Sequence, residues 1–157
     1  MRTGIGYDIH KLVKGRKFIL GGVKIPFHKG LTGHSDADTL LHAICDAMLG
    51  AAGLSDIGTF FPDTDARYKN IASAKLLKKV NTLITQKKFA INNIDTIIIA
   101  GKPKLLPFVP IIRKNIASIL GIPECAISVK AKTSQGIGPS GKGEAVEAFS
   151  VVTLKGR

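Results

Sequence analysis

Several residue types are missing or scarce in this chain of 157 residues, and each absence narrows the class of protein. There is no Trp, and aromatic residues form only 6% of the chain, so few side chains can stack on nucleobases. Only two cysteines are present, which excludes a four-cysteine zinc site and a framework of several disulfides. We expect Cys45 and Cys125, which lie far apart in apolar sequence, to be buried free thiols in a reducing compartment.

Long apolar runs are also missing. No run reaches the length that spans a membrane, and the first residues have neither the apolar stretch of a signal peptide nor the composition of a transit peptide. We therefore expect a cytoplasmic protein with no membrane segment. The length and the hydrophobic content of 45% predict one globular domain over residues 1–157.

The net charge of +12 is unevenly distributed along the chain. Residues 1–65 carry seven basic and seven acidic side chains, so the whole excess lies in residues 66–157. Three interpretations follow: a solvated basic face, attraction of a multiply charged phosphate substrate, or nucleic-acid binding. The scattered lysines and the few aromatic residues argue against nucleic-acid binding.

Apolar periodicity predicts an α/β fold of the α+β type, in which a mixed β-sheet packs against helices. Gly21-Gly22 falls inside the second predicted strand and indicates a turn or a bulge. The predicted strands are 2–10, 17–25, 91–100, 126–133 and 144–155, the predicted helices are 35–50, 72–85 and 106–120, and the predicted loops are 26–33, 53–70 and 134–143.

The predicted helix 35–50 is apolar almost all round except for one polar stripe. Ser35 and Asp38 resemble a capping box at its start. Asp38, His42 and Asp46 follow one another at intervals of four residues, so they share one side of the helix. Buried polar groups need partners, and Asp46 or a backbone carbonyl could orient the His42 ring.

Asp8, His10 and His42 form the first candidate site. Asp8 and His10 lie two residues apart on a predicted strand, so both side chains point to the same side. His42 joins them if the predicted helix packs over the end of that strand. Two histidines and a carboxylate are a common ligand set for catalytic zinc, which keeps an open position for water or substrate. The alternatives are a polar strand edge for Asp8 and His10, and a hydrogen-bonded core residue for His42.

Three further segments could bind ligands. His34 and Ser35, at the start of the predicted helix, could form an anion site, or Ser35 could be a simple cap. Residues 56–65 carry three acids and suit a ribose or metal contact, or form a plain surface loop. Residues 100–107 follow a predicted strand, where backbone groups can read the edge of a flat heterocycle, or they form a plain connection.

Long ordered motifs in this sequence resemble the family of 2-C-methyl-D-erythritol 2,4-cyclodiphosphate synthases, zinc enzymes of non-mevalonate isoprenoid biosynthesis. The resemblance runs along the whole chain without large insertions. Its motifs include Gly4-x-Gly6-Tyr7-Asp8-x-His10, His34-Ser35-Asp36-x-Asp38, His42-Ala43, Asp46-Ala47-x-Leu49-Gly50, Asp56-Ile57-Gly58-x-x-Phe61-Pro62-Asp63-Thr64-Asp65, Pro103-Lys104-Leu105-Leu106-Pro107 and Gly141-x-Gly143-Glu144.

The resemblance implies a homotrimer with active sites between adjacent subunits. It implies that the 2-phosphate of 4-diphosphocytidyl-2-C-methyl-D-erythritol 2-phosphate attacks the β-phosphorus, closes a cyclic diphosphate and releases CMP. Zinc would be held by Asp8, His10 and His42, and a magnesium or manganese ion would bridge the substrate diphosphate. The implied catalytic residues are His34 and Thr133, and the implied substrate-binding residues are Asp8, His10, His34, Ser35, Asp56, Gly58, Asp63, Ala100, Lys104, Leu105, Leu106, Thr133 and Lys142.

This sequence departs from the family pattern at three positions. Gln135 stands where the family usually has a Glu that helps to hold the second cation, so we expect weaker magnesium binding. Pro139 and Lys142 stand where a Phe and an Arg often line a pocket on the trimer axis that can hold isoprenoid diphosphates. Lys142 keeps the positive charge but lacks the two-pronged guanidinium.

Three other protein classes remain as alternatives. A zinc-dependent phosphohydrolase would use the open zinc position to activate water. A basic polyanion-binding module would bind with a steep salt dependence and show no turnover. A structural zinc domain would close the fourth position with protein, but after His10, His34 and His42 the only remaining histidine is His28, and we expect it on the surface.

Overall fold

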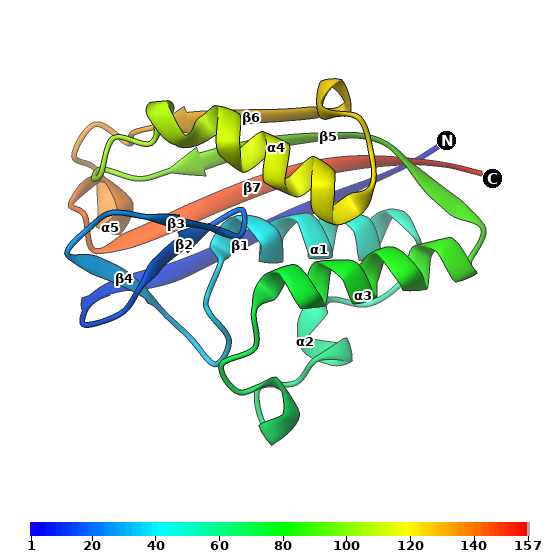
Figure 1. Ribbon diagram of the computed structural model, residues 1–157, viewed down its shortest axis with the longest axis horizontal. Helices are drawn as coiled ribbons and strands as arrows, with labels where there is room; N and C mark the ends of the chain where they lie inside the picture. The colour runs from blue at the N-terminus through cyan, green and yellow to red at the C-terminus, as the bar shows by residue number, and fades with distance from the viewer. Residues whose placement is uncertain (157) are drawn as a thin grey trace.

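A five-stranded sheet forms the back of the molecule in the computed structural model, which describes residues 1–156 (Figure 1). The strand order is β4-β1-β7-β5-β6, and only β5 and β6 run parallel. A separate hairpin, β2–β3, makes a second, two-stranded sheet. The strands are β1 (Arg2–Lys14), β2 (Phe18–Leu20), β3 (Val23–Ile25), β4 (Lys29–Thr32), β5 (Phe89–Ile99), β6 (Ile127–Lys132) and β7 (Ala145–Gly156).

Three long helices lie against one face of this sheet, as Figure 1 shows. They are α1 (Thr39–Ala51), α3 (Ser73–Gln86) and α4 (Val109–Leu120). Short helical turns occur at α2 (Ile57–Phe60), η1 (Ala66–Tyr68), η2 (Leu106–Phe108), η3 (Glu124–Ala126) and α5 (Gly138–Gly141). The mixed sheet packed against helices confirms the fold class predicted from the sequence.

Helix α1 lies unusually close to β1 because two glycines face it. A Cβ atom on Gly4 would stand 2.1 Å from the carbonyl oxygen of Ala47, and a Cβ on Gly6 would stand 2.0 Å from that of Ala43. The alternation of β1 places Asp8 and His10 on the same side as these glycines. The close packing of α1 therefore brings His42, the neighbour of Ala43, to Asp8 and His10 in the middle of β1.

The opposite face of the sheet is not covered by helices. Large apolar side chains on β1 and β7 are exposed there: Ile5 by 69%, Tyr7 by 45%, Ile9 by 42%, Phe149 by 36% and Val151 by 39%. An apolar patch of this kind on a sheet face is typical of a surface that another protein covers.

Several local predictions were wrong. The predicted loop 26–33 contains strand β4, which pairs with the end of β1 beyond the predicted strand 2–10. Ser35 is not the cap of α1, because Ala37 has a positive φ of 58° that interrupts the helical path. Asp38 is the cap instead, and its carboxylate accepts a hydrogen bond from the Leu41 N–H. Cys45 is buried as expected, but Cys125 is exposed because it lies in the short turn η3.

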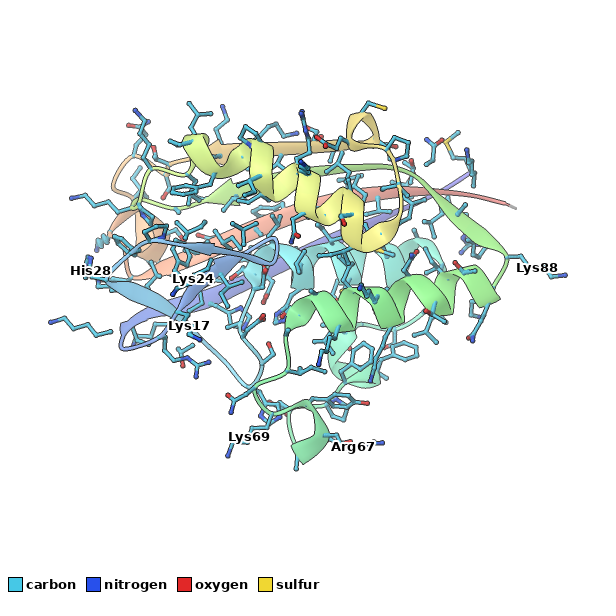
Figure 2. All side chains as sticks on the ribbon, viewed as in Figure 1. Lys17, Lys24, His28, Arg67, Lys69 and Lys88 are labelled. Atoms are coloured by element: carbon cyan, nitrogen blue, oxygen red, sulfur yellow. The ribbon has the colours of Figure 1, made fainter. Side chains whose placement is uncertain are left out.

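The predicted break at Gly21-Gly22 is the turn of the β2–β3 hairpin. His28 is exposed as expected. Figure 2 shows that basic side chains extend from separate ends of the molecule, with Lys17, Lys24 and His28 around the hairpin, Arg67 and Lys69 at η1, and Lys88 after α3. Within residues 1–156, none of the helices has the length and apolar character needed to cross a bilayer.

Candidate metal centre and ligand pockets

Asp8, His10 and His42 come together as the sequence predicted. The Nδ1 atoms of His10 and His42 lie 2.9 and 3.0 Å from the same oxygen, Asp8 Oδ2. Asp8 and His10 come from β1, and His42 comes from the second turn of α1. All three are partly buried, and one ligand atom from each lies within 4.8 Å of the others.

This arrangement fits a divalent metal ion. His42 Nδ1 makes a hydrogen bond to Asp8, whereas His10 Nδ1 is buried and, although it lies 2.9 Å from Asp8 Oδ2, is not aligned for a hydrogen bond to any group among residues 1–156. A buried polar atom without a partner is costly, and a metal ion between the three side chains would satisfy it. Two imidazoles and one carboxylate are a donor set that suits zinc and similar ions.

Protonation in the centre follows from the three side chains themselves. Burial works to raise the pKa of Asp8, but the neighbouring His10 and His42 rings outweigh burial and lower this pKa to about 2. Burial works to lower the pKa of His42, but Asp8 outweighs burial, so the pKa of His42 is raised above its ordinary value. Asp8 is therefore ionised at neutral pH, and its charge favours the protonated form of the His42 ring.

The other nitrogen of His42 faces two hydroxyl groups. His42 Nε2 lies 2.8 Å from Ser73 Oγ and 3.2 Å from Ser35 Oγ. The expectation that Asp46 or a backbone carbonyl orients the ring is wrong, because the partners of the ring nitrogens are Asp8, Ser73 and Ser35. Asp46 instead accepts a hydrogen bond from the Ile57 N–H. Ser73 was missed because, at the start of a predicted helix, it looks like an ordinary helix-start serine.

A pocket of about 330 Å³ opens beside Asp8, His10 and His42, the candidate metal centre. His10 and His42 form one wall, and predicted ligand residues from distant segments form others. The ring of His34 is held by a contact of 3.2 Å between its Nε2 and the carbonyl oxygen of Asp65. The predicted substrate-binding residues in this pocket are His10, His34, Ser35, Gly58 and Asp63, and the added apolar and aromatic lining is Ile57, Phe61, Tyr68, Ile71 and Leu76.

A second pocket of about 620 Å³ lies at the carboxyl ends of β5 and β6. The predicted nucleotide-binding residues all line this pocket, together with Phe27, which the sequence did not indicate. No residue lines both this pocket and the pocket beside the metal centre. The predicted residues in it are Ala100, Lys104, Leu105, Leu106 and Thr133.

Three predicted substrate-binding residues line neither pocket: Asp8, which lies in the cluster with His10 and His42, Asp56 and Lys142. Asp56 is exposed and caps the short helix α2, where the Thr59 N–H and hydroxyl donate to its carboxylate and lower its pKa. Lys142 is exposed at the end of α5. Gln135 and Pro139 are exposed in the same Gly-rich segment, and Gln135 has a positive φ of 53°.

Comparison with known proteins gives one consistent family. The YgbB family matches residues 1–155. The 2-C-methyl-D-erythritol 2,4-cyclodiphosphate synthase of Clostridium acetobutylicum is 55% identical over 98% of this chain and 99% of its own length.

Two solved structures have the same fold. The bifunctional IspDF from Campylobacter jejuni matches with a TM-score of 0.96 and 42% identity, and this chain covers 42% of that longer chain. A 2C-methyl-D-erythritol-2,4-cyclodiphosphate synthase in a CDP-bound form matches with a TM-score of 0.91 and 34% identity over 98% of this chain and 100% of its own. The chain therefore belongs to the YgbB family, in which its full-length relatives are 2-C-methyl-D-erythritol 2,4-cyclodiphosphate synthases.

Proposed function

We propose that this chain converts 4-diphosphocytidyl-2-C-methyl-D-erythritol 2-phosphate into 2-C-methyl-D-erythritol 2,4-cyclodiphosphate and CMP. The observation that carries the proposal is the cluster of Asp8, His10 and His42 beside a pocket that contains His34 and Ser35. The full-length relatives that bear the name of this enzyme support it.

Asp8, His10 and His42 would hold a zinc ion, each through one ligand atom. A bound zinc ion supplies Lewis-acid chemistry, which draws charge from a phosphate oxygen at its open position. The pKa of Asp8, lowered to about 2, keeps this carboxylate ionised and able to bind a cation at neutral pH.

The nucleophile of this reaction is a phosphate oxygen that is already an anion, so no side chain needs to remove a proton from it. The main task of the protein is to fold the substrate back on itself, because close positioning of two groups lowers the barrier strongly. His34 and Ser35, which line the pocket beside the metal centre, would hold the methylerythritol phosphate end. Gly58, Asp63 and the α2 cap Asp56 would contact the sugar parts from the rim.

The second pocket would take the cytidine end. Backbone groups between Ala100 and Leu106 can read the edge of a base, and Lys104 brings a positive charge toward the phosphates. Thr133 would act with His34 as a catalytic residue by holding the diphosphate during the attack. The CDP-bound relative supports a pocket for a cytidine nucleotide in this family.

The two pockets would form one active site between two copies of the chain in a homotrimer. The uncovered apolar sheet face supports assembly, since such patches are usually buried by a partner. The separation of the pockets supports a site shared between subunits, because no residue lines both.

Subunit mixing tests the shared site. Asp8→Ala removes the metal centre and Thr133→Ala alters the nucleotide pocket, so each variant alone is expected to lose most of its activity. Co-expression of the two should restore about one quarter of the sites in a head-to-tail ring, since one interface in four joins two intact halves. A mixed trimer without restored activity would contradict the shared site.

A second divalent cation, magnesium or manganese, would bridge the substrate diphosphate. Gln135 offers only a neutral carbonyl oxygen to such an ion, so this chain is expected to bind it more weakly than a relative with a carboxylate there. Lys142 would contribute a single positive charge near the diphosphate. The cytoplasmic location of the protein stays a prediction.

Phosphorus NMR with the cytidine diphosphate substrate, zinc and magnesium tests the reaction directly. The expected products are the cyclic diphosphate and an equal amount of CMP, with neither formed by Asp8→Ala. Release of inorganic phosphate would favour the zinc phosphohydrolase instead. Salt-sensitive binding to any polyanion without turnover would favour the polyanion-binding module.

A further inference from the structure

Ser73 connects the metal centre to a carboxylate that is not a metal ligand. This serine is the first residue of α3 and is fully buried. Its Oγ lies 2.8 Å from His42 Nε2, and its hydroxyl donates to Asp36 Oδ1. Asp36 thus lies two hydrogen bonds away from the imidazole of His42.

The direction of these hydrogen bonds is determined by the chemistry of the groups. Asp36 also accepts hydrogen bonds from the backbone N–H of Ser73 at 3.1 Å and of Asp38 at 3.3 Å, so its carboxylate acts as an acceptor. A serine hydroxyl has one proton, and in Ser73 this proton points to Asp36. The Oγ of Ser73 must then accept a hydrogen bond from Nε2–H of His42.

This chain of hydrogen bonds keeps a proton on Nε2 of His42. Without a metal ion, Nδ1–H donates to Asp8 Oδ2 at 3.0 Å, and a metal ion that displaced this proton would meet the lone pair on Nδ1. A ring nitrogen must have a free lone pair to bind a metal ion. The hydrogen bonds behind His42 therefore hold the ring in the form and the orientation that a metal ion requires.

We propose that Ser73 and Asp36 are positioning residues that set the tautomer and the ring orientation of His42 for metal binding. This inference rests on the proposed metal centre. Metal-bound histidines commonly donate their second N–H to a carboxylate or a carbonyl group. Here the carboxylate acts through the hydroxyl of Ser73.

The same network reaches the segment expected to hold the substrate. Asp36 directly follows Ser35, and the Asp36 N–H donates to the Ile71 carbonyl oxygen at 3.0 Å. Ser35 Oγ lies 3.2 Å from His42 Nε2, but a substrate phosphate on Ser35 would compete for this hydroxyl. Ser73, which lines neither pocket, would remain the partner of His42 while substrate is bound.

The test measures metal binding to the metal-free protein, without using activity. Zinc affinity is measured by calorimetry, and cobalt(II) reports the coordination geometry through its visible absorption. Ser73→Ala should weaken zinc binding about 10- to 100-fold, the usual effect of losing such a partner, and should alter the cobalt spectrum. Ser150→Ala is the matched control, because Ser150 is also a buried serine and has no hydrogen-bond partner in residues 1–156.

Two further variants complete the test. Ser73→Thr keeps the hydroxyl and should retain most of the affinity that Ser73→Ala loses. Asp36→Asn keeps an acceptor oxygen but removes the charge, so it should also weaken zinc binding. If Ser73→Ala does not fold, the zinc affinity of Asp36→Asn is the test of the proposal. The proposal would be overturned if the folded Ser73→Ala variant had the zinc affinity and the cobalt spectrum of the wild type. If Ser73→Ala does not fold, the same result for Asp36→Asn would overturn it. Failure of the wild type to bind zinc would instead overturn the metal centre itself.

Discussion

Replacing Gly6 by alanine tests whether the contact between β1 and α1 builds the metal centre. The new Cβ would stand 2.0 Å from the carbonyl oxygen of Ala43 and 2.8 Å from the backbone nitrogen of Ala47. Real Cβ atoms essentially never come closer than 3.0 Å to another heavy atom. The strand and the helix must therefore separate by about 1 Å, since the close-packed interior leaves no free space.

The cost of this separation can be estimated from the atoms involved. Overpacking a core costs about 1–3 kcal/mol, and the upper end applies here because backbone atoms of a helix cannot rotate away. In a chain of this size, about 3 kcal/mol corresponds to a Tm lower by roughly 6–12 °C. The same shift would separate His42, on α1, from Asp8, on β1, whose atoms are now 3.0 Å apart.

The assay compares Gly6→Ala with Gly50→Ala, because Gly50 lies on α1, the helix that Gly6 contacts. A Cβ on Gly50 would have its nearest contact 4.0 Å away, at the Ile5 carbonyl oxygen. Gly50→Ala should therefore be neutral or raise the free energy of unfolding by up to about 1 kcal/mol, with zinc affinity unchanged. Equal Tm and equal zinc affinity for Gly6→Ala and the wild type would refute the role of this close contact.

Two other predictions concern cations. The pKa of His42 is raised, and metal binding displaces its Nδ1 proton, so the apparent zinc Kd should rise about tenfold per pH unit below that pKa. Calorimetry in several buffers counts the released protons. A zinc affinity that does not change with pH would contradict this prediction. Gln135→Glu should lower the magnesium concentration needed for half-maximal activity, because it adds a negative charge near the diphosphate; identical magnesium titrations would exclude a role for this position.

The residues of the metal centre could be predicted from spacing, but their distances could not. Asp8 and His10 share a side of any regular strand, and His42 follows from the polar stripe on an apolar helix. The contact itself depends on Gly4 and Gly6, which let α1 approach β1. Glycines in a strand indicate either a bulge or a close approach, and the sequence alone does not distinguish between them.

The errors arose where tertiary contacts decide local structure. The segment 29–32 has weak strand character, and it forms β4 because the long end of β1 offers it hydrogen bonds. Ser35 is a residue type that often caps helices, but Ala37 has a positive φ, so the helix cannot begin at Ser35 and Asp38 is the cap. The role of Ser73 depends on a hydrogen bond to a residue 31 positions away, which no local pattern contains.

The cap residue Asp38 and two residues of α1, His42 and Asp46, show how one helix organises the surroundings of the site. The Asp38 carboxylate accepts hydrogen bonds from the N–H groups of Gly21 and Gly22 and so holds the β2–β3 turn. His42 meets β1 and α3, and Asp46 holds the first residue of α2. These residues are spaced by one helical turn, about 6 Å each. Because a helix is rigid over two turns, α1 sets the distances between the hairpin, the metal centre and the α2 rim, which is why a change in how α1 packs should alter all three together.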